Sequence, residues 1–483
     1  MTFGEIIGII DGFVWGWPLI VALIGTHVFM TIRTGFIQKD IFKAIKMSFE
    51  KDPDSEGDVS QFGALTTALS STIGTGNIIG VATAFIAGGP GAILWMWLTG
   101  VFGIATKYSE TLIAVKYRVK SEDGSMIGGA MYALERGKNW KWLGIIFAFL
   151  AAICAFGIGC MVQSNAVMGN VTNTFKGGFI TDITVGIVLA ILIALVIIGG
   201  IQSITRVSEA LVPFMAIFYF LGCLVILFMN GHYVGEAVKL IVSSAFTGKA
   251  VLGSLVGSGI AAACRFGFAR GLFSNESGMG SAPLVASAAQ TRNSKRQAMV
   301  SMTGTFWDTV VICLMTGLVL TSSVLKSPAL LDAATKVAEN GEKFIDKSIL
   351  TNLAFGQIPY IGSPILVIGL ITFAFSTILG WYYYGERCAV YLLGEKVIPI
   401  YKVLWVLGVF VGCIAQLDTL WNIADLLNGL MALPNIIAVL ALSGVIAAET
   451  KKYAGEHIMD KDETPIPTIK NANAGVLNKK AQQ

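Results

Sequence analysis

Long apolar stretches recur along the 483-residue chain, and each is long enough to cross the hydrocarbon core of a membrane. One helical crossing needs about 20 predominantly apolar residues. The stretches lie near residues 7–31, 60–88, 91–115, 143–170, 183–201, 209–230, 250–290, 298–324, 363–393, 399–417 and 421–447. The stretch 250–290 is interrupted by glycine and polar residues, so it counts as one broken span. The sequence therefore predicts an all-α polytopic membrane protein with eleven transmembrane helices.

The composition excludes several classes of protein. Hydrophobic residues make up 54% of the chain and charged residues 13%, against about 45–50% and about 25% in soluble proteins. A soluble enzyme, a disordered protein and a nucleic-acid-binding protein are therefore excluded. The seven cysteines lie inside apolar stretches without metal-ligand spacing, which is typical of small buried hydrophobic residues.

The distribution of lysine and arginine predicts the orientation. Cytoplasmic loops carry an excess of these residues. If the N-terminus is outside and each span crosses once, 24 of the 34 basic residues fall on the cytoplasmic side, seven on the external side and three within spans. We therefore expect a multi-pass plasma-membrane protein with an external N-terminus and a cytoplasmic C-terminus.

Two spans carry glycine and small polar residues in their middle. One reads Ala68-Leu-Ser-Ser-Thr-Ile-Gly-Thr-Gly-Asn-Ile-Ile-Gly80 and the other reads Arg270-Gly-Leu-Phe-Ser-Asn-Glu-Ser-Gly-Met-Gly280. Close helix packing would explain the glycines of the first run, but it does not explain a carboxylate inside the membrane, which is costly. Unwound backbone persists at membrane depth only where it lines a buried cavity.

The two interruptions occupy corresponding positions in two halves of the chain. Broken helices in such positions indicate the binding site of a secondary transporter at the bilayer midplane. We expect an extra N-terminal helix, a cytoplasmic amphipathic segment, two five-helix inverted repeats joined by an external connection, and a cytoplasmic tail. Their ranges are 1–31, 32–58, 59–230, 231–249, 250–447 and 448–483.

Helix ends at such breaks attract charged groups. Exposed N–H groups attract a carboxylate, and exposed carbonyls attract a cation. Thr75 and Gly76 are the candidates for N–H groups that face a substrate carboxylate. Acceptors for an ammonium group, together with a wall for a short side chain, are expected from the second break, at Phe273, Ser274, Asn275 and Ser277.

The ninth span places two neighbouring hydroxyls, Ser376 and Thr377, in the middle of the membrane. Hydroxyl and carbonyl oxygens suit a hard cation such as Na⁺. The alternative is that both hydroxyls bond back to a carbonyl of the preceding turn, which is their ordinary fate. From this segment alone, the alternative is favoured.

Five motifs resemble the alanine or glycine:cation symporter family. They are Gly74-Thr-Gly-Asn-Ile78, Gly88-Gly-Pro-Gly-Ala-Ile-Leu-Trp-Met-Trp97, Gly128-Gly-Ala-Met-Tyr132, Gly271-Leu-Phe-Ser-Asn-Glu-Ser-Gly-Met-Gly-Ser-Ala-Pro283 and Trp381-Tyr-Tyr-Tyr-Gly-Glu386. The resemblance covers nearly the whole transmembrane region. It implies sodium-coupled uptake of alanine or glycine through a leucine-transporter-like fold with one extra N-terminal helix.

The resemblance also implies roles for particular residues. Thr75, Gly76 and Asn77 resemble the carboxylate-binding break of that fold, and Phe273 resembles the aromatic residue at the second break. Thr377 and Trp381 would face the substrate, with Trp381 limiting its size. The sodium site would draw on carbonyls and hydroxyls of Ser70, Ile73, Phe373, Ser376 and Thr377, which reverses the preference for back-bonding in the ninth span.

Five further polar positions carry open alternatives. Gln163 and Asn165 in the fourth span either contact the substrate or form an interhelical hydrogen bond. Glu276 either receives the substrate ammonium or caps N–H groups of the broken helices, and helix-end electrostatics favours capping. Lys107 and Glu110, three residues apart on one helix face, indicate a structural or gating pair.

These observations predict a secondary transporter that works by alternating access, with alanine or glycine, sodium and membrane lipid as its partners and no cofactor beyond the coupling ion. A proton-coupled transporter of the same fold, with Glu276 as the carrier, is the alternative. A channel is disfavoured because the polar residues cluster at one depth. An enzyme is disfavoured because the chain has no HExxH motif and only three histidines.

Overall fold

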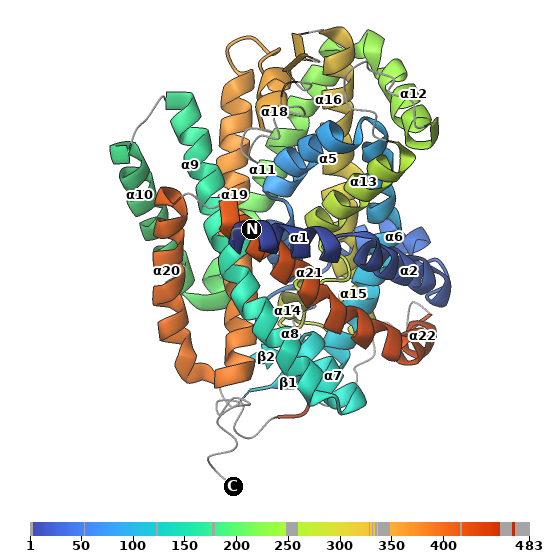
Figure 1. The fold of residues 1–483 in the computed structure, drawn as a ribbon. Coiled ribbons are helices and arrows are strands. Elements are labelled where there is room, and N and C mark those ends of the chain that lie inside the picture. The colour runs from blue at the N-terminus through green and yellow to red at the C-terminus, as the bar shows by residue number, and fades with distance from the viewer. Residues whose placement is uncertain are drawn as a thin grey trace.

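The computed structural model describes residues 3–52, 54–121, 124–175, 179–247, 259–327, 329–330, 332–333, 336, 348–415, 418–454 and 466–468. Figure 1 shows a bundle of helices with a small hairpin at one end. The elements before residue 230 are α1 Phe3–Val14, α2 Trp17–Arg33, η1 Ile37–Asp40, α3 Ile41–Ser48, α4 Gln61–Thr72, η2 Gly76–Gly80, α5 Val81–Gly88, α6 Gly91–Lys116, β1 Val119–Lys120, β2 Met126–Ile127, α7 Ala130–Lys138, α8 Lys141–Cys154, η3 Ala155–Met161, α9 Val162–Phe175, α10 Phe179–Ile198 and α11 Gly200–Met229.

The later elements continue the bundle, and several of them lie beside helices of the first half. They are α12 Gly231–Thr247, α13 Ile260–Asn275, α14 Ala282–Ala286, α15 Ser294–Thr305, η4 Phe306–Cys313, α16 Leu314–Lys326, α18 Ser348–Phe355, α19 Gly362–Leu393, η5 Glu395–Val397, α20 Ile398–Ile414, α21 Asp418–Ala441 and α22 Ser443–Lys452. Helices α13 and α15 both pack against α6, and α19 packs against α4, α8, α9 and α11.

The prediction of an all-α membrane protein is confirmed in its coarse form. The described residues contain eight helices that are long and apolar enough to cross a membrane, or nine if the bent pair α4 and α5 is one span. The predicted crossings at 91–115 and 250–290 are not among them. The second of these begins in residues 250–258, outside the described residues, and α13 alone spans 16 residues.

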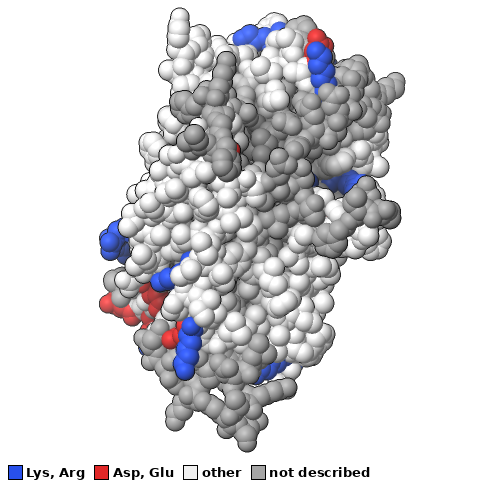
Figure 2. Space-filling view, turned by 60° about the vertical axis from the view of Figure 1, so that its left-hand side comes forward, with Lys and Arg blue, Asp and Glu red and all other residues white. Residues whose placement is uncertain are grey.

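The outer surface of the bundle is apolar. Large hydrophobic side chains such as Leu195 on α10, Phe228 on α11 and Val403 on α20 are exposed. A soluble protein seldom leaves so much contiguous apolar surface uncovered, whereas a lipid-facing surface requires it. Figure 2 shows a largely uncharged surface, with most charged side chains toward its two ends.

The first predicted span is divided by a turn. Helix α1 ends at Val14 and α2 begins at Trp17, with Pro18 in its first turn. Proline suits the first turn of a helix because its missing N–H has no helical partner there. The following segment 32–58, predicted to be amphipathic, contains α3, which buries Ile41 and Ala44 and exposes Phe42.

Both predicted interruptions coincide with helix ends. Helix α4 ends at Thr72, Ile73 is extended with ψ 90°, and the chain resumes as the π-helical turn η2 followed by α5. The axes of α4 and the following helix differ by 51°. Helix α13 ends at Asn275, and the next helix, α14, begins at Ala282.

The backbone between α13 and α14 requires glycine at two positions. Gly278 and Gly280 have φ values of 90° and 78°, which residues with a side chain rarely adopt. Glu276 also lies in the left-handed region, with φ 53°. A non-glycine residue held in this region is uncommon and is often found at functional sites.

Candidate functional site

The first break is held open by its own asparagine. The backbone N–H of Gly74 donates to Oδ1 of Asn77 at 2.8 Å, which satisfies a donor just before the start of η2, where backbone N–H groups have no helical partner. A Cβ added at Gly74 would lie 2.6 Å from Oγ1 of Thr377 on α19. The break therefore needs glycine at this position because α19 approaches its backbone closely.

The second break is capped by a carboxylate from α6. The N–H groups of Gly278 and Gly280 both donate to Oε2 of Glu110 at 3.1 Å. Glu110 also forms the predicted ion pair with Lys107, at 3.1 Å, and both side chains are buried. The capping role that helix-end electrostatics favoured for Glu276 is thus performed by Glu110, because the fold brings α6 against the turn.

The side chain of Glu276 instead lines a cavity. Its Oε1 accepts a hydrogen bond from Nε1 of Trp381 at 3.1 Å, and its Oε2 accepts one from the Ser281 hydroxyl at 2.5 Å. The Glu276 backbone carbonyl accepts from Nζ of Lys107 at 3.1 Å. The carboxylate is therefore fixed in position at the wall of the cavity.

The cavity lies between the two breaks and α19. The volume in which the centre of a water-sized sphere can lie is about 20 Å³. About 10–15 Å³ of such volume is enough to hold one water molecule. Its lining residues come from α4, the first break, η3, α9, α13, α19 and α21; they are Ser71, Thr72, Gly74, Thr75, Gly76, Ile158, Gln163, Phe273, Glu276, Thr377, Trp381 and Asn428. A space of this size holds about one water molecule.

A group of oxygens lies at the edge of this cavity where α19 faces α4. The hydroxyls of Ser376 and Thr377 each donate to the Phe373 carbonyl at 2.9 Å. Ser376 also reaches the Ser70 carbonyl at 3.2 Å. Ile73, the fifth residue of the predicted sodium site, is buried at the end of α4. Both hydroxyls therefore form the expected hydrogen bonds to a carbonyl of their own helix. Ser376 in addition brings an oxygen of α19 close to a carbonyl of α4.

The predicted substrate residues divide into two groups. Six of them line the cavity: Thr75, Gly76, Gln163, Phe273, Glu276, Thr377, with Trp381 as a seventh on the same wall as Glu276. Gln163 also accepts a hydrogen bond from the Thr75 hydroxyl at 3.3 Å. The cavity therefore combines backbone of the first break with side chains of the second.

The other predicted substrate residues contact protein groups elsewhere. The Asn165 side chain donates to the Gly412 and Ala415 carbonyls on the α20 side, at 3.2 and 3.3 Å. Asn275 donates to Thr99 and Thr309, and Ser277 pairs with Thr305. Asn77 and Ser274 both donate to Asp308.

Sequence reasoning missed several residues at the site. Asp308 is a fully buried carboxylate on η4, and Asn428 on α21 lines the cavity. A charged residue inside an apolar span is costly and marks function by default. That signal was present at Asp308 in the eighth apolar stretch. The cavity-lining Ser71, Thr72 and Ile158 carry no comparable signal, since such residues are common in membrane helices.

An ionic cluster adjoins Phe273 on α13. The guanidinium of Arg270 lies 5.7 Å from the centre of the Phe273 ring and 3.8 Å from Oδ2 of Asp425 on α21. Asp11 on α1 lines the same small cavity as these two charged residues, so α1, α13 and α21 meet there. Arg270 therefore links the wall of the central cavity to two other helices.

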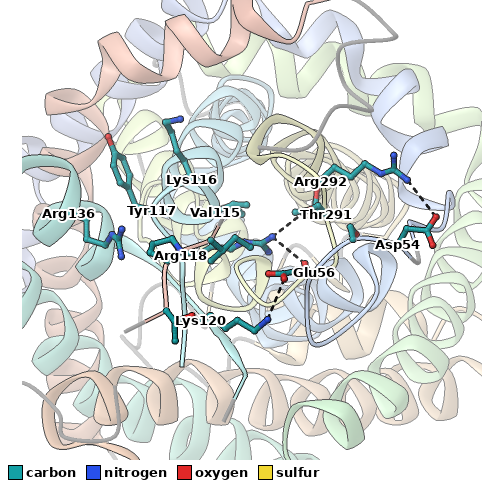
Figure 3. Close-up of a pocket in the computed structure, with 14 residues that line it drawn as sticks. Asp54, Glu56, Val115, Lys116, Tyr117, Arg118, Lys120, Arg136, Thr291 and Arg292 are labelled. Carbon is teal, nitrogen blue, oxygen red and sulfur yellow. Dashed lines mark hydrogen bonds and ion pairs between the residues drawn. The ribbon is translucent and has the colours of Figure 1, made fainter. Parts of the chain in front are cut away.

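A second, larger cavity lies near the β1–β2 hairpin (Figure 3). The volume in which the centre of a water-sized sphere can lie is about 810 Å³ there. Arg118 is one of the cavity's lining residues, drawn near the centre of Figure 3, and donates to the carbonyls of Ala289, Thr291 and Glu56 at 2.7, 3.1 and 3.2 Å. Arg118 thereby ties the segment before α4 to the segment after α14. The carbonyl of Pro467 accepts a hydrogen bond from the Lys120 N–H at 3.0 Å in the same region.

Comparison with known proteins identifies the family. The profile described as "Sodium:alanine symporter family" matches residues 1–466. The chain is 49% identical over 461 residues to "Sodium/alanine symporter AgcS" of Methanococcus maripaludis, and the match covers 94% of this chain and 98% of that protein. The resemblance found in the sequence motifs is therefore confirmed.

Two solved structures resemble this one in fold. One is MhsT in complex with L-phenylalanine, with a TM-score of 0.54 and 14% identity over 83% of this chain and 100% of that chain. The other is a Na⁺-coupled sialic acid symporter in a substrate-bound outward-open state, with a TM-score of 0.55 and 13% identity over 89% of this chain and 87% of that chain. At these identities the likeness concerns the fold alone, and it supports the expected leucine-transporter-like architecture.

Proposed function

The chain belongs to the sodium:alanine symporter family, and we propose that it carries alanine or glycine into the cell together with sodium. Members of this family are transporters, so the chain is a membrane carrier and not an enzyme. The observation that carries the substrate assignment is the small cavity between the two breaks, with backbone of Thr75 and Gly76 on one side and the Glu276 carboxylate on another. A zwitterionic amino acid has charges that match these groups, and a short side chain requires the least enlargement of a cavity that holds about one water molecule as it stands.

The two ends of the amino acid have different partners. The N–H groups at the first break bind the carboxylate, as helix N-termini generally do. The Glu276 carboxylate receives the ammonium group. Phe273 and Trp381, which both line the cavity, enclose the side chain and limit its size. Gln163 accepts a hydrogen bond from Thr75 in the first break. Because Gln163 also lines the cavity, it can contact the substrate directly.

Sodium binds beside the substrate, at the oxygens of α4 and α19. Carbonyls of Ser70, Ile73 and Phe373 and hydroxyls of Ser376 and Thr377 form the ligand set. The 3.2 Å separation of Ser376 Oγ from the Ser70 carbonyl supports this assignment, because one ion can reach oxygens of both helices only if they lie close together. Thr377 borders both the sodium oxygens and the cavity, and so couples the two ligands.

Transport proceeds by alternating access. In this proposal, the Arg270–Asp425 contact on one side and the contacts of Arg118 with backbone carbonyls on the other act as gates. Opening of one and then the other, as one group of helices rocks against the rest, exposes the site to each side in turn. The proposed topology has eleven crossings, with the N-terminus outside, the extra helix in 1–31 and inverted repeats in 59–230 and 250–447.

Uptake into proteoliposomes tests the function. Purified protein is reconstituted, a sodium gradient is imposed, and uptake of labelled alanine is measured with a panel of competing amino acids. We expect uptake that requires the sodium gradient and is inhibited by glycine and alanine. Potassium in place of sodium is the control for the ion.

A proton gradient without sodium tests the alternative coupling ion. The buried Glu276 carboxylate at the cavity wall is the feature that favours this alternative, since a carboxyl group can carry a proton. Uptake that follows the proton gradient and ignores sodium would overturn the sodium assignment while leaving the substrate assignment intact.

A further inference from the structure

Asp308 lies where the two breaks meet, although no role follows for it from substrate or sodium binding. It belongs to η4, a π-helical stretch between α15 and α16, and its side chain is fully buried. Three neutral donors reach its carboxylate: Asn77 at 2.7 Å, the Ser274 hydroxyl at 3.0 Å from Oδ2 and 3.3 Å from Oδ1, and Thr309 at 2.6 Å. A buried carboxylate needs such donors, because burial without them costs several kcal/mol.

These bonds form a continuous path from one break to the other. The Gly74 N–H donates to Oδ1 of Asn77, and Nδ2 of Asn77 donates to Oδ1 of Asp308. The Ser274 hydroxyl donates to the Asp308 carboxylate, with Oδ2 the nearer oxygen at 3.0 Å. Asp308 therefore touches one residue of each break, and through Asn77 it acts on the backbone that lines the cavity.

The two breaks also lie against each other without intervening side chains. A Cβ added at Gly76 would lie 3.4 Å from Cα of Ser274 and 3.6 Å from Cδ1 of Phe273. Two backbone segments this close keep one relative position only if other interactions fix them. A buried polar network can do so when all of its donors and acceptors have hydrogen-bond partners. Asp308, on η4, accepts hydrogen bonds from one side chain of each segment, Asn77 and Ser274.

We propose that Asp308 is a positioning residue that joins the two breaks into one unit by accepting hydrogen bonds from Asn77 and Ser274. The hydrogen bonds, and not the negative charge, supply this function. The inference rests on the proposed function, because it assigns Asp308 the task of keeping the carboxylate-binding break aligned with Phe273 and Glu276. It predicts that the pair of residues 77 and 308 matters more than either residue alone.

Exchange of the two side chains tests the proposal. In Asn77→Asp, two carboxylates face each other across the 2.7 Å contact, so the variant should bind alanine at least about tenfold more weakly. In Asp308→Asn, the amide oxygen can accept from Asn77 while its NH₂ group donates to the Ser274 and Thr309 hydroxyls, so affinity should stay within about threefold. In the double variant, the carboxylate introduced at position 77 accepts from the Gly74 N–H and from the amide introduced at position 308, so binding should be restored.

Alanine binding to the purified full chain at about pH 8 in sodium buffer is the measurement, with Asp308→Ala as the variant that removes both acceptors. Asp308→Ala should weaken binding at least about tenfold, because Asn77 and Ser274 both lose the carboxylate acceptor and Asn77 keeps only its longer contact with the backbone carbonyl of residue 308, at 3.2 Å. A double variant as weak as Asn77→Asp, or an Asp308→Asn variant as weak as Asp308→Ala, would overturn the proposal. Asn230→Asp is the matched control, since Asn230 is also buried but contacts Ser323 and Lys326.

The thermal unfolding midpoint without substrate gives a second reading of the same variants. If wild-type protein does not bind alanine in sodium, the proposed function fails, but the exchange can still be scored from unfolding. Asn77→Asp should then unfold at a lower temperature than wild type, and the double variant should recover most of the loss. Absence of recovery in both measurements would refute the pairing of residues 77 and 308.

Discussion

Trp381 and Glu276 form one wall of the central cavity, and they are joined by a 3.1 Å hydrogen bond from the indole. The indole is held from behind as well, since a Cβ added at Gly159 would collide with it. The hydrogen bond at the N–H edge of the ring and the packing of Gly159 against Cβ and the ring atoms together oppose rotation of this side chain. The two residues to which we assign the size limit and the charge of the site are therefore joined to each other by a hydrogen bond.

Trp381→Ala should widen the range of amino acids that the protein accepts. Loss of the indole enlarges the cavity, and a few methylene groups of added space change selectivity by about tenfold or more. Inhibition of labelled alanine binding by valine, leucine and phenylalanine is the measurement. Trp381→Phe is the control, because it keeps a ring while removing the donor to Glu276. An unchanged inhibition profile in Trp381→Ala would contradict the role of this residue.

Thr377→Ala should remove the sodium dependence of alanine binding. Thr377 borders both the cavity and the oxygens of the proposed sodium site, and binding coupling between two ligands is reciprocal. Alanine affinity is measured in matched sodium and potassium buffers. Thr372→Ala is the control, since that hydroxyl bonds back to the Ile368 carbonyl on the same helix. A variant that still requires sodium would argue against the site.

At the scale of elements, each break is completed by a helix that is distant in sequence. Helix α6 caps the second break through Glu110, and η4 joins both breaks through Asp308. Asn435 on α21 adds a hydrogen bond to Glu110 at 2.8 Å. The unwound backbone therefore has the internal partners that the membrane interior demands.

Glu110→Gln should destabilise the protein. It leaves Lys107 buried without its ion-pair partner, and loss of one member of a buried pair costs about 3–5 kcal/mol. The thermal unfolding midpoint of the purified protein should fall, and the double variant Lys107→Met/Glu110→Gln should recover part of the loss because no uncompensated charge remains. Equal midpoints for wild type and Glu110→Gln would show that the pair is not structurally important.

The positions of both breaks were predictable because helix interruption is a local property. Glycine and small polar residues inside an apolar run weaken a membrane helix wherever they occur. The residues that satisfy the breaks were not predictable in the same way. Glu110 was expected only to pair with Lys107, and its contact with Gly278 and Gly280 depends on how α6 packs against α13.

At the scale of the whole molecule, two sets of arginine contacts join segments that are distant in the sequence, and we propose that they act as gates on the two sides of the central cavity. Arg118 binds backbone carbonyls near the hairpin, whereas Arg270 lies over an aromatic ring and beside a carboxylate. The first set joins segments from the two halves of the chain, and the second joins α13 to α21 beside α1. Alternating access would require the Arg118 contacts and the Arg270 contacts to break at different stages of the transport cycle.

Labelling of single introduced cysteines tests the proposed orientation. Lys138 is the last residue of α7 and Lys239 lies on α12, and both residues are exposed. A membrane-impermeant maleimide applied to intact cells should label Lys239→Cys and spare Lys138→Cys, and permeabilised cells should allow both reactions. Wild type gives the background from its native cysteines. The reverse pattern would invert the topology.

The sequence by itself determined the membrane location, the helical class, the family and the places where two spans break, because hydropathy and helix interruption depend on neighbouring residues. Only the tertiary structure decided which polar groups meet. Asn165 turned toward α20, Glu276 toward the cavity, and Asp308 toward Asn77 and Ser274. Helix packing decides which residues meet when they are tens to hundreds of positions apart in the sequence. The sequence around either residue does not determine that packing.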